Sequence, residues 1–122
     1  MTNLREITSI APKRIWADVR ARIVESDRIT LALVELPPDG VVPEHRHGND
    51  QVGMVIEGSV TFRIGEETRE LGPGGTWTIP SNEPHQVTAG GQGAVVVDVF
   101  SPTRTDWGQI AAEVVHPPRW PR

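Results

Sequence analysis

The chain contains no cysteine among its 122 residues. That absence excludes disulfide bonds and metal sites built on thiolates, so any metal ion must be held by nitrogen and oxygen atoms. The first eleven residues lack the apolar stretch of a signal peptide. The densest apolar run, Ala94 to Val97, ends at Asp98 and is too short to cross a bilayer. These absences predict a cytoplasmic protein that does not bind membranes.

Clustered basic residues are also missing. The net charge is −4 and the arginines are scattered along the chain, which excludes nucleic acid as a partner. A length of 122 residues suits one domain with one core. We therefore predict a single domain over residues 1–122. Its barrel spans about residues 19–104, and an extended, proline-containing tail covers residues 116–122.

Alternation of apolar and polar residues with a period of two dominates the chain, which is typical of strands with one buried face. Val60, Phe62 and Ile64, for example, share one strand face. Turns rich in glycine and proline separate such segments, and this favours an all-β sandwich or barrel. The predicted strands cover residues 19–26, 28–36, 41–47, 51–57, 59–64, 68–71, 76–79, 85–89 and 94–100. The one predicted helix runs from Trp107 to Val115, with Asp106 as its N-cap.

Three histidines and one glutamine are candidate metal ligands. His45 and His47 are two residues apart in a strand-like segment, so their imidazoles leave the same face. Gln51 opens the next strand and can reach the same point, and His85 lies where a later loop feeds a strand. This set predicts one divalent metal ion per chain with open positions, as in catalytic sites. The alternative is that Gln51 only hydrogen-bonds nearby; His116, in the tail, is predicted not to bind metal.

A second group of functional candidates lies at the end of the last predicted strand. Asp98 interrupts a run of valines, and a lone carboxylate on an apolar inward face is costly unless it is paired or coordinated. Phe100 shares its face, and the turn at residues 101–103 can swing Arg104 back over the barrel mouth. An arginine there suits bidentate binding of a substrate carboxylate. The alternative is a structural ion pair between Asp98 and Arg104, with Phe100 in the core.

The spacing of these residues resembles the cupin family. Its first motif is matched by Gly40, His45, His47, Gln51 and Gly58. Its second motif is matched by Gly74, Pro80 and His85. The resemblance implies a cupin fold, which is a double-stranded β-helix or jelly-roll barrel, around a metal such as Ni, Zn, Fe or Mn. The family usually has glycine where Asn82 stands and asparagine where Ala89 stands, but neither is a ligand position.

The closing segment from Asp98 to Arg104 resembles that of the uronate-linearising cupins of pectin and alginate breakdown, the KdgF type. The match covers about residues 28–107. In that family three histidines and a glutamine hold the metal, and an aspartate, a phenylalanine and an arginine line the active site. The resemblance implies conversion of 4,5-unsaturated monouronates to linear 4-deoxy-5-keto-uronates, with Asp98, Phe100 and Arg104 as catalytic residues.

Gln51 stands where many metal cupins have glutamate. A neutral amide leaves a bound dication with its full charge, which favours Lewis-acid chemistry on a small carboxylated substrate over an oxygen-activating iron site. An Fe(II)-dependent dioxygenase is the first alternative, and metal content and oxygen consumption distinguish it. A non-catalytic module that binds a small ligand is the second, although such a module need not keep an intact metal set.

Val95, Val97 and Val99 face away from the predicted site. Because an exposed apolar strand face or edge favours pairing, we expect a homodimer, in which residues 19–25 could exchange between subunits.

Three tryptophans, Trp16, Trp77 and Trp107, could wall a sugar pocket. We instead expect them to pack under the barrel ends or at a subunit interface.

Overall fold

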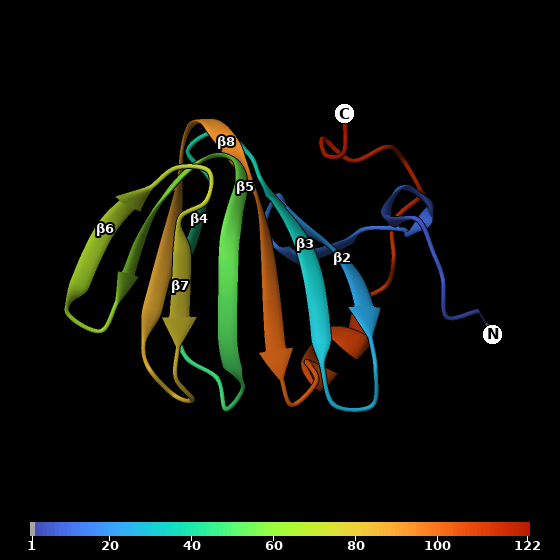
Figure 1. Cartoon of the computed structure of the whole chain (residues 1–122), viewed down its shortest axis with the longest axis horizontal. Coiled ribbons are helices and arrows are strands. Elements are labelled where there is room, and N and C mark those ends of the chain that lie inside the picture. Colours follow the sequence, from blue (N-terminus) through green and yellow to red (C-terminus); the bar gives the residue numbers. More distant parts are fainter. Residues whose placement is uncertain (1) are drawn as a thin grey trace.

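The computed structural model describes residues 2–122, so Met1, the start of the predicted domain, lies outside the described residues. Its elements are η1 (Ile7–Ser9), β1 (Lys13–Trp16), β2 (Val19–Glu25), β3 (Thr30–Leu36), β4 (Val41–His45), β5 (Asp50–Ile64), β6 (Glu67–Leu71), β7 (Thr76–Ile79), β8 (His85–Ser101) and η2 (Thr105–Gln109). The strands join in one antiparallel sheet with the order β1-β2-β3-β8-β5-β6, while β4 pairs with β8 and β7 with β5 (Figure 1). The sheet curls into the predicted jelly-roll barrel.

The two long strands, β5 and β8, run through both halves of the barrel. The first half of β8 pairs with β4 and the second half of β5, whereas its second half pairs with β3 and the first half of β5. The β5–β8 register shifts on both sides of Gly58, whose φ of +75° favours glycine. The predicted breaks within 51–64 and 85–100 are therefore wrong, because each strand bends at its glycines without ending.

Inward-facing residues of the strands fill the barrel, as the alternation predicted. The buried apolar cluster comprises Val19, Ala21, Ala32, Val34, Leu36, Val55, Val60, Phe62, Trp77, Ile79, Ala89, Ala94, Val96, Phe100 and Trp107.

The predicted helix over Trp107–Val115 is wrong. The chain forms only the short 3-10 helix η2 and then lies extended against β1, a strand that the sequence did not predict. Pairing with β1 overrides the local helix preference. Asp106 does not cap a helix, because its carboxylate binds Arg104. No helix within residues 2–122 has the length and apolar character needed to span a membrane.

The C-terminal tail lies over the outer face of the sheet. The backbone N–H of Arg119 donates to Glu35 at 2.9 Å, and Arg122 forms an ion pair with Glu57 at 2.7 Å. Val95 is the cross-strand neighbour of both glutamates and is fully buried. The prediction of an exposed Val95 is therefore wrong, because the tail binds the glutamates on both sides of this valine.

Candidate functional site

The three predicted ligands meet where β4 and β8 begin to pair. His45 ends β4 opposite His85, which begins β8, and His47 follows in the next loop. The ring centroids of the three histidines lie 4.3, 4.9 and 5.7 Å apart, and one ligand-capable atom from each falls within 4.8 Å of the others. These three side chains could hold a metal ion. His116 lies outside this group, in the C-terminal tail, where its backbone carbonyl accepts a hydrogen bond from Arg22 of β2.

Each of the three rings is oriented by a backbone carbonyl. Nδ1 of His45 lies 2.9 Å from the carbonyl oxygen of Pro43. Nδ1 of His47 lies 3.1 Å from that of Asn49, and Nδ1 of His85 lies 2.8 Å from that of Glu83. A carbonyl only accepts hydrogen bonds, so each Nδ1 carries the proton and each Nε2 keeps a lone pair. Within residues 2–122 the buried Nε2 of His85 has no hydrogen-bond partner.

Burial favours the neutral, metal-binding form of two of the histidines, His47 and His85. Burial lowers the pKa of His85 from 6.5 to about 4, with the neighbouring histidines and Arg104 acting in the same direction. Burial also lowers the pKa of His47, and the charge of Arg104 adds to this effect. At neutral pH the Nε2 lone pairs are therefore available to a cation.

Gln51 links the histidines to Asp98. Its Nε2 donates to Oδ1 of Asp98 at 2.9 Å, which turns its Oε1 towards Nε2 of His47 at 3.1 Å. Because the single proton of the neutral His47 ring lies on Nδ1, two lone pairs face each other across that distance. Neighbouring ligands of a metal ion with bonds of about 2.1 Å lie roughly 3 Å apart. The Oε1 atom of Gln51 is therefore at a distance from His47 that two ligands of one ion can have.

Asp98 is buried and held through a single oxygen atom. The indole Nε1 of Trp77 donates at 2.7 Å to the same Oδ1 that accepts from Gln51. Burial raises the pKa of Asp98 from 3.8 to about 6, although both hydrogen bonds and the charge of Arg104 oppose the rise. Such a carboxyl group can both accept and release a proton near neutral pH.

Trp77 was not among the residues predicted to form the site, yet the sequence holds a signal for it. Gly53 is the register partner of both Asp98 and Trp77, and a Cβ atom at Gly53 would overlap the two side chains. A glycine inside a strand often marks such a close approach.

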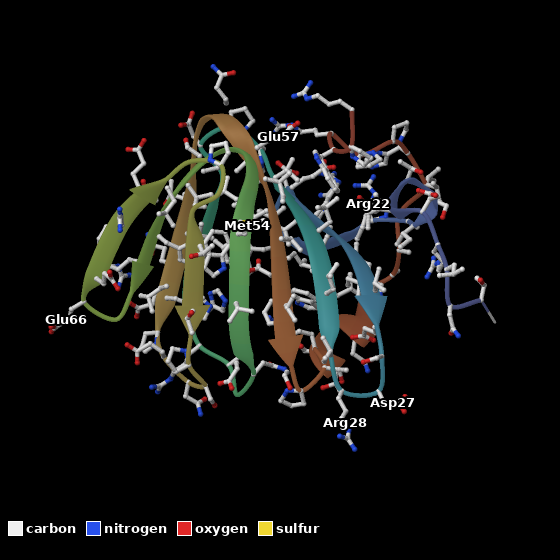
Figure 2. The ribbon with its side chains drawn as sticks, in the orientation of Figure 1. Arg22, Asp27, Arg28, Met54, Glu57 and Glu66 are labelled. Atoms are coloured by element: carbon white, nitrogen blue, oxygen red, sulfur yellow. The ribbon has the colours of Figure 1, made fainter. Side chains whose placement is uncertain are left out.

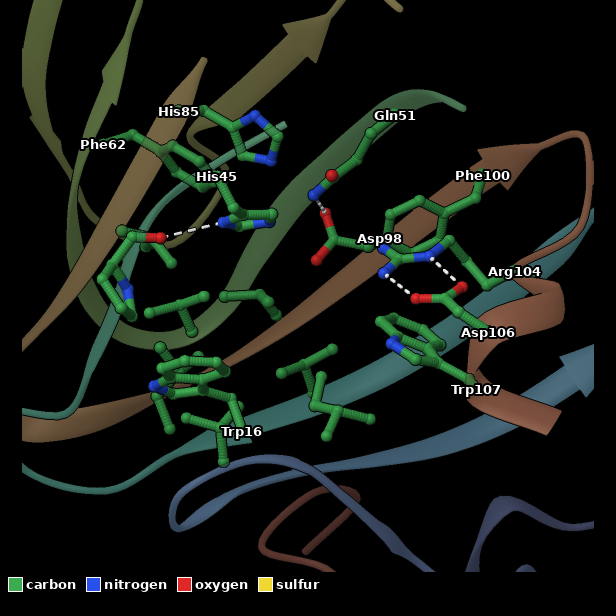
Figure 3. Close-up of a pocket in the computed structure, with 18 of the residues that line it drawn as sticks. Trp16, His45, Gln51, Phe62, His85, Asp98, Phe100, Arg104, Asp106 and Trp107 are labelled. Atoms are coloured by element: carbon green, nitrogen blue, oxygen red, sulfur yellow. Dashed lines mark hydrogen bonds and ion pairs between the residues drawn. The ribbon is translucent and has the colours of Figure 1, made fainter. Parts of the chain in front are cut away.

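Arg104 returns over the barrel mouth, as predicted, but its ionic partner is Asp106. Its Nε and Nη2 donate to the two carboxylate oxygens of Asp106 at 3.0 and 2.8 Å (Figure 3). The guanidinium carbon lies 4.1 Å from the ring centroid of Trp107 and 4.8 Å from that of Phe100. The alternative ion pair with Asp98 does not form among residues 2–122. Asp106 thus occupies the edge of the guanidinium formed by Nε and Nη2, and Nη1 takes no part in this ion pair.

A cavity of about 330 Å³ brings the two groups of candidates together. Its lining includes His45, Gln51, His85, Asp98, Phe100 and Arg104, but not His47. Trp16, half exposed at the cavity rim, and the buried Trp107 form part of its wall. The expectation that the tryptophans lie away from the pocket is wrong for these two. Trp77 packs beneath the cavity, with its ring centroid 4.6 Å from that of Phe62.

The family model described as "Cupin domain" matches residues 32–100, more than half of the chain. The chain belongs to the cupin family. It is 33% identical over 89 residues to the pectin degradation protein KdgF of Dickeya dadantii (strain 3937), which covers 72% of this chain and 81% of the relative. This similarity confirms the resemblance to KdgF-type cupins.

Two solved cupin structures share the fold. KdgF from Halomonas sp. is 24% identical with a TM-score of 0.80, over 87% of this chain and 98% of that protein. An RmlC-like cupin from Shewanella frigidimarina NCIMB 400 is 18% identical with a TM-score of 0.81, over 88% of this chain and 96% of that protein.

One departure from the cupin motifs is explained by backbone geometry. Asn82, which stands where the family usually has glycine, has a φ of +66°. Asparagine tolerates this left-handed region better than most residues do. Its backbone N–H donates to the carbonyl of His47 at 2.8 Å. The substitution therefore keeps the loop that leads to His85 tied to the first motif.

Proposed function

We propose that this cupin is a metal-dependent, non-redox enzyme that converts 4,5-unsaturated monouronates to linear 4-deoxy-5-keto-uronates. The observation that carries the proposal is the Gln51 side chain, which turns its oxygen to the histidines and its amide to the buried Asp98. That arrangement puts a metal site and a proton carrier side by side. The name of the Dickeya dadantii relative, a pectin degradation protein, supports a uronate as the substrate.

His45, His47, His85 and Gln51 would hold the ion. When bound, a divalent ion supplies Lewis-acid polarisation of a substrate oxygen, and no change of its redox state is needed. Because all four donors are neutral, they cancel none of its positive charge. Nη1 of Arg104, which takes no part in the ion pair with Asp106, binds the substrate carboxylate.

The conversion is an isomerisation that needs one proton carrier. As the ring bond between the anomeric carbon and the ring oxygen breaks, the anomeric hydroxyl loses a proton and becomes an aldehyde. The ring oxygen leaves as an enolate, which becomes a ketone when C4 gains a proton. Asp98 takes the first proton and delivers the second, which a carboxyl group with a pKa of about 6 can do. Phe100 and Trp107 keep water away from the arginine and the acid.

The test is the loss of ultraviolet absorbance of the conjugated carboxylate, after a lyase has supplied the unsaturated monouronate. Purified protein with an added divalent metal should accelerate this loss without consuming oxygen. If no divalent metal produces acceleration, the substrate assignment is wrong. Oxygen consumption coupled to turnover would instead favour the dioxygenase alternative.

We expect one divalent metal per chain and a more stable fold when it is bound. At a hundredfold excess of metal over the dissociation constant, binding should raise the free energy of unfolding by about 2.7 kcal/mol. Calorimetry with and without a chelator measures the rise. His85→Ala should abolish both the metal and the rise, whereas His116→Ala should change neither. A melting curve unaffected by the chelator, in protein that purifies without metal, would contradict the proposal.

We also propose a homodimer, built on the outer face of the sheet. Val99 lies between Leu31 and Val52 in the strand register, and Val97 and Val99 are half-buried. Residues 19–25 form β2 and pair with β3 of the same chain, so a dimer does not require strand exchange. Apolar side chains that are 36–46% exposed include Val24, Ile29, Leu31, Val52 and Met54. Figure 2 shows Met54 on this face, at the middle of β5.

The dimer predicts a change of mass when this face becomes charged. Met54→Glu and Leu31→Lys should each shift the protein towards monomer in light scattering at micromolar concentration, because burying an unpaired charge is costly. Val114→Lys changes a tail residue that is 86% exposed and should leave the mass unchanged. A monomer mass for the unmodified protein would contradict the dimer.

A further inference from the structure

The cavity has two chemically different ends. The polar end carries His45, His85, Gln51, Asp98 and Arg104. The opposite end offers aliphatic side chains, and the indole ring of Trp16 lies across the cavity from the polar groups (Figure 3). The aliphatic compartment is lined by Val19, Val34, Leu36, Val42, Val87 and Val96.

The division of the cavity into a polar and an aliphatic end follows from the strand register. Asp98 faces inward on β8, and the next inward residue, about 7 Å along the strand, is Val96. Val34 is the cross-strand partner of Val96 on β3, and both valines are buried. On the other half of β8 the same two-residue step leads from His85 to Val87. Each polar position is thus followed by a valine deeper in the cavity.

The six side chains that line the aliphatic compartment offer no hydrogen-bond partner to a hydroxyl group. A hydroxyl that leaves water without finding a partner weakens binding by about tenfold or more. A hydrocarbon group placed there gains affinity, because it leaves water for an apolar surface. The compartment therefore selects against a second sugar-like portion of a ligand and in favour of an apolar one.

We propose that the cavity binds small carboxylates that carry an alkyl, alkenyl or aryl group, with the carboxylate at the polar end and the apolar group between Val34, Val96 and Leu36. For the carboxylate end, this inference rests on the proposed function. It adds that substrates with an apolar substituent bind better than an unsubstituted monouronate, which leaves the aliphatic compartment empty.

A homologous series of straight-chain carboxylates tests the compartment directly. Butanoate, hexanoate and octanoate are titrated into the whole protein by calorimetry, with and without added Zn²⁺. Affinity should rise roughly fourfold for each added methylene until the compartment is full. Galacturonate, which has the carboxylate but no apolar group, should bind more weakly than hexanoate. An affinity that does not change with chain length would overturn the proposal.

Two variants locate the apolar group. Val96→Thr and Val34→Thr each put a hydroxyl into the compartment at nearly constant size, and each should lower the affinity for octanoate about tenfold while changing that for butanoate much less. Val97→Thr, one residue along β8 on the outer face, is the matched control and should bind like the parent. Melting curves show that each variant is folded. Equal losses for butanoate and octanoate, or no loss in either inward variant, would overturn the assignment of the compartment.

The ultraviolet assay separates this inference from the proposed function. Turnover of the unsaturated uronate together with a flat chain-length series would overturn only the present inference. A steep series without uronate turnover would support the present inference and overturn only the uronate substrate.

Discussion

Replacing Asp98 by asparagine should lower the rate of uronate linearisation by about 10²- to 10⁴-fold, the usual contribution of a positioned general acid–base. The asparagine can keep its Oδ1 as acceptor for the hydrogen bonds from Gln51 and Trp77. What it loses is the carboxyl group that takes and returns a proton. Rates follow from the loss of ultraviolet absorbance, and elemental analysis should show unchanged metal content. Activity within a few-fold of the parent would make Asp98 a structural residue.

Arg104→Lys is the comparison that separates proton transfer from substrate capture. Lysine keeps the positive charge but cannot bind Asp106 through two nitrogens and present a third to a substrate. Its main effect should be a higher KM, whereas Asp98→Asn should mainly lower kcat. If both variants changed only KM, neither residue would act in the chemical step.

The histidine set could be predicted because its geometry is local. The prediction treated His45 and His47 as residues of one strand face. In the structure β4 ends at His45, and His47 reaches the site from the following loop, two residues away along the chain. The position of His85 came from the spacing of a known motif. The hydrogen bond from Trp77 to Asp98 joins residues 21 positions apart. This hydrogen bond forms only because β7 and β8 both pair with β5. The register of these pairings cannot be predicted from a local sequence pattern.

The structure of the C-terminal segment could not be predicted from its local sequence. A run from Trp107 to Val115 contains residues compatible with a helix, and sequence alone offered Asp106 as its cap. In the fold, Asp106 is used by Arg104 and the following residues pair with β1. Tertiary partners decided both outcomes, because one short helix contributes little on its own.

Gln51→Glu should keep the metal and slow the reaction strongly. In the parent, the amide donates to Asp98 at 2.9 Å. A glutamate has no proton to donate when ionised, so two carboxylates would meet at this contact. Two carboxylates this close share one proton. The proton that Asp98 must transfer to the substrate would then be held between Asp98 and the new glutamate. The added negative ligand also cancels one charge of the bound ion and lowers its Lewis acidity.

Gln51→Leu provides the contrasting variant, because it removes both the oxygen that faces His47 and the amide that faces Asp98. Its affinity for metal, measured by competition with a chelator, should fall markedly, while that of Gln51→Glu should be retained. Gln86→Glu on β8 adds the same charge beside His85, and Gln86 does not line the cavity, so it should leave the rate within a few-fold of the parent. Equal rates in the parent, Gln51→Glu and Gln51→Leu would show that Gln51 only hydrogen-bonds nearby. Loss of activity with retained metal in Gln51→Glu alone would instead show that the amide serves Asp98 as well as the ion.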